Sequence, residues 1–355
     1  MWRGASAASA AAVLLLAAGA PPARGAGPAS PEASGCPAAE AGLEDHPEVE
    51  QMRAVFVQSR LATVSDRSAV FGDPEQQAAG GPGVARLLRS AGALSMTAEE
   101  RVKLVTPVAW FHVPKTGTSF CNTLYHTPGV CEFFPRENYI GDSTSAGSWD
   151  PTWRAMDGLC PGGFSATYRP ATTGQHGGLD QSLWELNRGH LVTMLRQPEQ
   201  RLISGYNHEG QMEWPFDTPA ASLREYAEWM AGGTVRQLAR GGGHASGELP
   251  VPTAEEVSVA VGRLRDGFAF VGVTEQWDLS VCLFRAMFGG VCVASDFSNT
   301  RLGNASTGSS LYDTSELYGF VDNYDGPVYA EALVLLSKGV ELYGVDESKC
   351  TADCW

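Results

Sequence analysis

One stretch, Val108–Tyr125, constrains this chain more than any other, because its residue types change abruptly from apolar to polar and back. It opens with the continuous apolar run VAWFHV, which predicts a buried β-strand. Pro114 ends the run, since proline cannot donate to a central ladder. The polar loop Lys115–Ser119 follows, and then an apolar-spaced segment that predicts a helix. A strand, a tight polar loop and a helix start together predict an anion site lined by backbone N–H groups.

The loop side chains suit an anion as well. Gly117 lets the backbone approach a phosphate closely, and Lys115 adds a positive charge. Hydroxyl donors come from Thr116, Thr118 and Ser119. The loop is not a Walker A sequence, because its lysine precedes the glycine instead of following it. The alternative interpretation is an ordinary strand–turn–helix corner with a solvated lysine.

A second stretch, Leu191–His208, repeats the pattern. LVTML predicts another buried strand, and Arg196, Pro198, Arg201 and Ser204 come after it. A guanidinium fork matches a phosphate dianion, and a hydroxyl adds a further donor. The alternative is a helix N-terminus with proline near its first position and a solvated arginine pair.

These two stretches resemble the two phosphate motifs of sulfotransferases that use 3′-phosphoadenosine 5′-phosphosulfate (PAPS). P-K-T-G-T-S-F is similar to their 5′-phosphosulfate loop, and L-R-x-P-x-x-R-x-x-S-x-Y is similar to their 3′-phosphate motif. The resemblance spans about residues 105 to 345. It implies a three-layer α/β fold like that of P-loop kinases, with a central parallel sheet flanked by helices. It also assigns the 5′-phosphosulfate to Lys115, Thr116, Gly117, Thr118 and Ser119, and the 3′-phosphate to Arg196 and Ser204.

The resemblance also implies roles in catalysis. Lys115 would stabilise charge on the leaving phosphate. His176, in T-G-Q-H-G-G, resembles the base histidine of heparan sulfate 2-O- and 6-O-sulfotransferases, and a base of near-neutral pKa suits proton removal from a hydroxyl. The rival base is Glu132, placed like the glutamate of the N-sulfo and 3-O enzymes. His176 as a plain surface residue is the alternative. His112 is interpreted as a packed core residue, and His208 as part of the second helix.

The C-terminal third supplies further elements and one weak motif. The run F-V-G-V-T-E-x-W resembles a segment of the 6-O-sulfotransferase group and is expected to complete the sheet. Arg301 resembles a late basic residue that touches the 3′-phosphate, but the glycosylation sequon at Asn304 conflicts with that role. The first loop is one residue shorter than in the 2-O and 6-O enzymes, which leaves the acceptor subgroup open. The pattern predicts a strand over Phe268–Thr274 and helices over Ala221–Arg240, Ala254–Asp266, Trp277–Phe288 and Leu317–Tyr343, the last interrupted near Gly326–Pro327.

The N-terminus predicts entry into the secretory pathway. The apolar run Ala5–Ala20 after Arg3 has the layout of a signal peptide and is shorter than the roughly 20 residues of a spanning helix. Golgi sulfotransferases carry a signal anchor, so residues 1–25 are a cleaved signal or a type II membrane anchor. Residues 26–100 are interpreted as an Ala/Pro/Gly-rich stem with a helical extension, and 101–355 as the catalytic domain. The protein would be Golgi-luminal or secreted.

The eight cysteines predict disulfides in that compartment. The local pairs Cys121–Cys131, Cys282–Cys292 and Cys350–Cys354 are one expectation, with Cys36 joined to Cys160 or to another chain. No C-x-x-C occurs, so no zinc site is predicted.

The net charge of −15 makes the chain a poor general binder of nucleic acid or of anionic membrane. A local basic cleft is expected around Lys115, Arg196 and Arg201. The predicted function is sulfo transfer from PAPS, without a metal, to a carbohydrate hydroxyl. The alternatives are a magnesium-dependent phosphotransferase with a degenerate P-loop and a secreted, non-catalytic binding protein. The sequence does not indicate the oligomeric state.

Overall fold

The computed structural model describes residues 83–131, 164–166, 176–208, 211, 214–243, 250–297, 311–346 and 348–350. All of them belong to one compact unit, residues 75–355. The predicted signal or anchor, the stem up to residue 82, Glu132, Arg301 and Asn304 lie outside the described residues.

The core of the described part is a parallel sheet. Its strands are β1 (Val108–Trp110), β2 (Phe164–Ala166), β4 (Leu191–Leu195) and β6 (Phe268–Val273), in the order β2-β1-β4-β6. All three pairings are parallel. β1, β4 and β6 are buried along their whole length, which explains why their sequences are continuous apolar runs rather than alternating ones. β1 is shorter than the predicted run, although the Phe111 N–H still donates to the Val192 carbonyl at 2.9 Å. A two-residue pairing joins β3 (Gly177–Gly178) to β5 (Gly242–Gly243).

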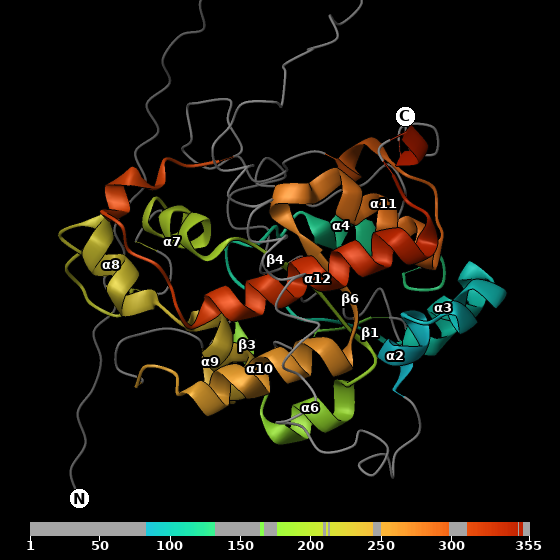
Figure 1. Cartoon of the computed structure of the whole chain (residues 1–355), viewed down its shortest axis with the longest axis horizontal. Helices are drawn as coiled ribbons and strands as arrows, with labels where there is room; N and C mark the ends of the chain where they lie inside the picture. The colour runs from blue at the N-terminus through green and yellow to red at the C-terminus, as the bar shows by residue number, and fades with distance from the viewer. Residues whose placement is uncertain are drawn as a thin grey trace, which may run out of the picture. The chain divides into compact units, whose positions relative to one another are not determined.

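Helices surround this sheet, and α10 (Ala254–Gly267), α11 (Trp277–Phe288) and α12 (Asp325–Tyr343) all contact β6 (Figure 1). Side-chain caps mark several helix starts, among them the reciprocal capping box of Thr253 and Glu256 at α10. The α/β class with a parallel sheet flanked by helices is therefore confirmed. The other described helical elements are α2 (Val84–Leu88), η2 (Ala91–Ser95), α3 (Ala98–Val105), α4 (Phe120–Tyr125), α6 (Gln181–Asn187), α7 (Pro198–Tyr206), α8 (Leu223–Met230), α9 (Gly233–Ala239), η4 (Thr274–Gln276), η5 (Ala294–Asp296) and η6 (Thr314–Leu317).

The predicted helix over Leu317–Tyr343 needs one correction. Gly326 and Pro327 do not interrupt a helix, because α12 begins at Asp325 and holds both residues in its first turn. Proline is tolerated there, since the N–H groups of a first turn have no intrahelical acceptor. His208 also lies just beyond α7, which ends at Tyr206.

The disulfide pattern differs from the predicted local pairs. Cys282 of α11 is bonded to Cys350, and the two residues are 68 positions apart in the sequence. Cys121 is a buried thiol in α4, whereas Cys131 and Cys292 are in disulfides. The three local pairs were therefore wrong. For Cys282, the packing of α11 against the C-terminal segment, and not sequence proximity, determines that the partner is Cys350.

No helix in the described ranges combines the length and the apolar character that crossing a bilayer requires.

Candidate anion-binding site

The direction in which strands are added to the sheet reverses between β1 and β4. From β1 the chain reaches β2 on one side, whereas β4 lies on the other side of β1. Such a reversal opens a crevice at the carboxyl ends of the two central strands, where open α/β sheets bind ligands. The Lys115 loop follows β1 and Arg196 follows β4, so both predicted motifs lie at this edge.

The loop after β1 presents a row of backbone donors. Lys115 and Gly117 have φ values of 64° and 88°, so the chain turns twice through the left-handed region. Within the described residues, no acceptor lies opposite the N–H groups of Thr116, Gly117 and Thr118. Successive N–H groups in such a turn form a concave nest for an anion.

The start of α4 contributes less than its sequence predicted. The N–H groups of Phe120, Cys121 and Asn122 donate to the carbonyls of the three preceding loop residues, at 3.0–3.1 Å. α4 has only six residues, so its dipole is small. The anion donors therefore lie in the loop itself, one turn before the helix.

Two of the loop hydroxyls make contacts inside the protein. Thr116 Oγ1 donates to the Val113 carbonyl at 2.6 Å, and Thr118 Oγ1 lies 3.0 Å from His112 Nε2. Both hydroxyls thus hold the shape of the loop. Ser119 is buried at the start of α4 and forms no side-chain cap there.

Gly117 is required by a neighbour that the sequence did not indicate. A Cβ at this position would lie 2.6 Å from Cζ3 of Trp277 and 3.0 Å from Cγ2 of Thr274. Trp277 is held in turn, because its indole N–H donates to the Asp296 carbonyl at 2.7 Å. The glycine therefore serves both the left-handed φ and the close approach of the Trp277 ring.

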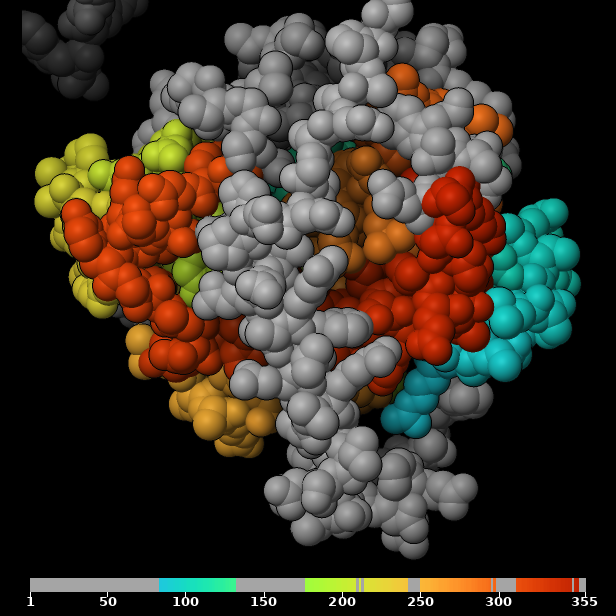
Figure 2. Space-filling view, turned by 45° about the horizontal axis from the view of Figure 1, so that its top comes forward, coloured from blue at the N-terminus to red at the C-terminus, as the bar shows by residue number. Residues whose placement is uncertain are grey.

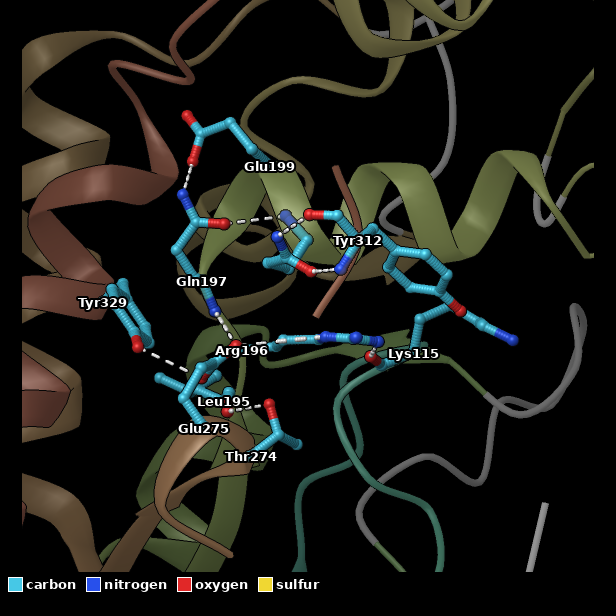
Figure 3. A network of polar contacts seen from close by, with 10 residues as sticks. Lys115, Leu195, Arg196, Gln197, Glu199, Thr274, Glu275, Tyr312 and Tyr329 are labelled. Atoms are coloured by element: carbon cyan, nitrogen blue, oxygen red, sulfur yellow. Dashed lines mark hydrogen bonds and ion pairs between the residues drawn. The ribbon is translucent and has the colours of Figure 1, made fainter. Parts of the chain in front are cut away.

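Arg196 joins the two motifs (Figure 3). Its Nη1 lies 3.5 Å from the Lys115 carbonyl oxygen, its Nε lies 3.9 Å from Glu275 Oε1, and its guanidinium stacks 5.2 Å from the centroid of the Tyr312 ring. The side chain is 14% exposed. Burial lowers the pKa of Arg196, and the charge of Glu275 opposes that shift. The guanidinium is thus fixed against the loop backbone beside the nest.

Tyr312 belongs to a segment that is fastened to α7. The side-chain amide of Gln200 donates to the Tyr312 carbonyl at 2.8 Å and accepts from its N–H at 2.7 Å. η6, which follows in the same segment, contacts both α7 and α8, and Figure 2 shows the orange segment beside the yellow α8. These bonds hold the Tyr312 ring over Arg196.

Arg201 does not belong to the site. It is buried in α7 and its Nη2 lies 3.0 Å from Asp325 Oδ2, in an ion pair whose side chains are 5% and 2% exposed. Of the three residues expected to form a basic cleft, Arg196 lies near Lys115, whereas Arg201 is paired with Asp325 inside the fold. Ser204 is buried in the same helix.

His176, the residue that the resemblance suggests as base, lies against His112. Its ring centroid is 5.1 Å from that of His112, the residue that contacts Thr118. Gln237 connects the two segments, because its Nε2 donates to the carbonyls of His112 (2.7 Å) and Gly177 (3.1 Å). His112 is a core residue by burial, yet it lies directly beneath the loop and against His176.

The segment after β6 is the part of the site that sequence reasoning missed. Thr274 and Trp277 lie against Gly117 of the first motif, and Glu275 faces Arg196 of the second, although the segment was expected only to complete the sheet. The sequence did contain a signal for this role: Thr274 and Glu275 are polar residues at the carboxyl end of a parallel strand, which is the edge of the sheet where α/β proteins bind ligands.

The described side chains form no group of three or more His, Cys, Asp or Glu residues that could hold a metal ion. Comparison of the chain with protein-family models, with curated proteins and with solved structures finds no match.

Proposed function

We propose that this chain is a sulfotransferase that moves a sulfo group from PAPS to a hydroxyl of a carbohydrate acceptor in the secretory pathway. The observation that carries the proposal is the contact between its two motifs: Arg196 Nη1 lies 3.5 Å from the Lys115 carbonyl, at the carboxyl ends of adjacent parallel strands. A 5′- and a 3′-phosphate on one nucleotide need two such anion sites side by side. The metal-free chemistry and the sulfotransferase version of the α/β fold belong to the same proposal.

The loop fits the phosphosulfate end of this substrate. Three N–H groups, of Thr116, Gly117 and Thr118, are available to anionic oxygens, and Lys115 adds a charge at the same turn. Fixed donors of this kind stabilise negative charge without reorganisation. Arg196, with Ser204 and Arg301 as further proposed contacts, would hold the 3′-phosphate.

The transfer step assigns one role to each side of the site. The acceptor oxygen forms a bond to sulfur while the bond from sulfur to the phosphate oxygen breaks, and the electron pair stays on that oxygen beside Lys115. His176 takes the proton of the acceptor hydroxyl as general base. Its position against His112, which contacts Thr118 of the loop, supports this role, and Glu132 is the alternative base.

Calorimetric titration of the full chain, without magnesium, tests the nucleotide site. Adenosine 3′,5′-bisphosphate should bind tightly and in preference to ADP and ATP. A preference for ATP that needs magnesium would overturn the proposal in favour of a phosphotransferase. Binding of the bisphosphate without transfer of label from PAPS to any glycan acceptor would favour a non-catalytic binding protein.

Variants then connect binding to the named residues. Lys115→Ala should abolish transfer while the protein stays folded, and Lys103→Ala should leave transfer unchanged, because Lys103 pairs with Glu99 on the surface. Arg196→Ala should weaken binding of the bisphosphate by about 2–5 kcal/mol, the cost of removing one partner of a buried charge pair. Unchanged affinity in Arg196→Ala would show that the 3′-phosphate binds elsewhere.

A further inference from the structure

Glu275 is a buried carboxylate at the edge of the candidate anion site. It lies in η4, directly after β6, and its side chain is 5% exposed. Its Oε1 accepts from the Gln197 N–H at 3.1 Å, and its Oε2 accepts from the Tyr329 hydroxyl at 3.1 Å (Figure 3). Burial and the Glu275 charge raise the pKa of Tyr329, which keeps its hydroxyl protonated as a donor. The carboxylate is therefore fixed in place from two sides.

The fixed carboxylate faces Arg196. The distance of 3.9 Å between Arg196 Nε and Glu275 Oε1 is long for a hydrogen bond, so the interaction is chiefly one of charge. The opposite edge of the guanidinium, at Nη1, points to the Lys115 carbonyl. Arg196 thus lies between a carboxylate on one side and the anion loop on the other.

We propose that Glu275 is the resident counter-ion of Arg196: it orients the guanidinium, and its charge opposes the phosphate that Arg196 binds. The identity of that phosphate rests on the proposed function, whereas the ion pair does not. Glu275 is a positioning residue, because it contacts Arg196 and not the substrate, and its charge reaches the phosphate only across the guanidinium.

The size of the opposing effect follows from Coulomb's law. A phosphate on the Nη edge would lie roughly 7 Å from the carboxylate, and at an effective dielectric constant of about 20 each unit of charge then weakens binding by about tenfold to a hundredfold. A carboxylate at this place lowers the affinity for the nucleotide and so allows the bound nucleotide to dissociate. The structure therefore indicates a site built for release as well as for binding.

A double-mutant cycle on the full chain tests the ion pair. Glu275→Gln keeps the size of the side chain and an acceptor for the Gln197 N–H, but it removes the negative charge that faces the buried guanidinium. We expect Tm to fall by roughly 5 °C. The Tm of the double variant Arg196→Gln/Glu275→Gln should fall by clearly less than the sum of the decreases in the two single variants. Additive losses would overturn the counter-ion assignment.

The control for this cycle is Glu331→Gln. Glu331 is 10% exposed and pairs with Arg265 at 2.7 Å, so it is another shielded glutamate in an arginine pair. Its substitution should leave the coupling between Arg196 and Glu275 unchanged, and it should leave nucleotide affinity unchanged.

Anion titrations test the opposing charge. Inorganic sulfate should raise the Tm of Glu275→Gln more than that of the wild type, because an anion can replace the missing carboxylate. Adenosine 3′,5′-bisphosphate should bind to Glu275→Gln at least about tenfold tighter than to the wild type, with the affinity for adenosine 5′-monophosphate unchanged. Equal or weaker bisphosphate binding by the variant, where the wild type binds it, would overturn the opposing role.

The two proposals fail in different ways. If the wild type binds neither nucleotide, the proposed function is wrong, while the double-mutant cycle and the sulfate titration still decide whether Glu275 is the counter-ion. If the wild type binds the bisphosphate and the cycle is additive, the proposed function stands and the counter-ion assignment is wrong.

Discussion

Replacing Gly117 by alanine adds one methyl group at the tightest point of the anion loop. The new Cβ would lie 2.6 Å from Cζ3 of Trp277 and 3.0 Å from Cγ2 of Thr274. Real Cβ atoms do not approach side chains to 2.6 Å, so either the loop or the indole ring has to move. Trp277 cannot move freely, because its N–H is bonded to the Asp296 carbonyl, and the Asp296 carboxylate pairs with Arg285 at 2.7 Å.

Two separate terms set the magnitude. A non-glycine residue at a φ of 88° costs about 1–2 kcal/mol of backbone strain. Forcing a methyl group into a packed contact costs a further 1–3 kcal/mol, approximately. Gly117→Ala should therefore lower the free energy of unfolding by about 2–5 kcal/mol.

Gly319→Ala separates the two terms. Gly319 has a similar φ of 75°, but no atom lies within 4 Å of the Cβ that alanine would add. The free energy of unfolding of this variant should fall only by the backbone strain, about 1–2 kcal/mol. Urea unfolding of both variants, with equal m-values, gives the difference directly. Equal losses in the two variants would refute the claim that Trp277 supports the loop from behind.

Three further predictions concern His176, Asp325 and Glu256. His176→Ala should leave adenosine 3′,5′-bisphosphate affinity unchanged while kcat falls by about 10²–10⁴-fold, the usual contribution of a general base; full activity would make Glu132 the leading base. Asp325→Asn should lower the free energy of urea unfolding by about 3–5 kcal/mol at neutral pH, because it leaves the buried Arg201 charge unpaired; a loss below 1 kcal/mol, approximately, would mean that this pair is not a buried charge pair in solution. The Arg240 contact lowers the pKa of Glu256 from 4.5 to about 2, so its stabilisation is complete above pH 4.5 and is lost as the pH falls toward 2. The difference in unfolding free energy between wild type and Arg240→Gln should therefore shrink over that pH range. It starts from about 1 kcal/mol, the value for a partly exposed pair. A difference that stays constant with pH would contradict the claim that Arg240 lowers the pKa of Glu256.

Local sequence determined most of the secondary structure. LVTML and FAFVGV do not alternate between apolar and polar residues, because both faces of a central parallel strand are covered, and both form strands where predicted. Thr253 and Glu256 start α10 through bonds that span only three residues, so the helix start can be read from sequence alone. The loop of Lys115 and its position after a strand could also be predicted from the sequence, because they depend on neighbouring residues.

Tertiary structure decided which of these residues meet. Arg196 and Arg201 look alike in sequence, but Arg201 is one turn into α7 and faces Asp325 of a distant helix, while Arg196 faces the loop. Cys282 of α11 bonds to Cys350 of the segment after α12, although nearer cysteines exist in the sequence.

The role of the Thr274–Trp277 segment was decided in the same way. Its proximity to Gly117 and Arg196 arises only when β1, β4 and β6 line up in one parallel sheet and place their carboxyl ends at one edge. Local propensities act over a few residues, whereas ion pairs, disulfides and close ring contacts depend on segments that the fold brings together from far apart in the chain. For that reason the sequence of this protein identified the motifs, and only the packed sheet showed which neighbours hold them.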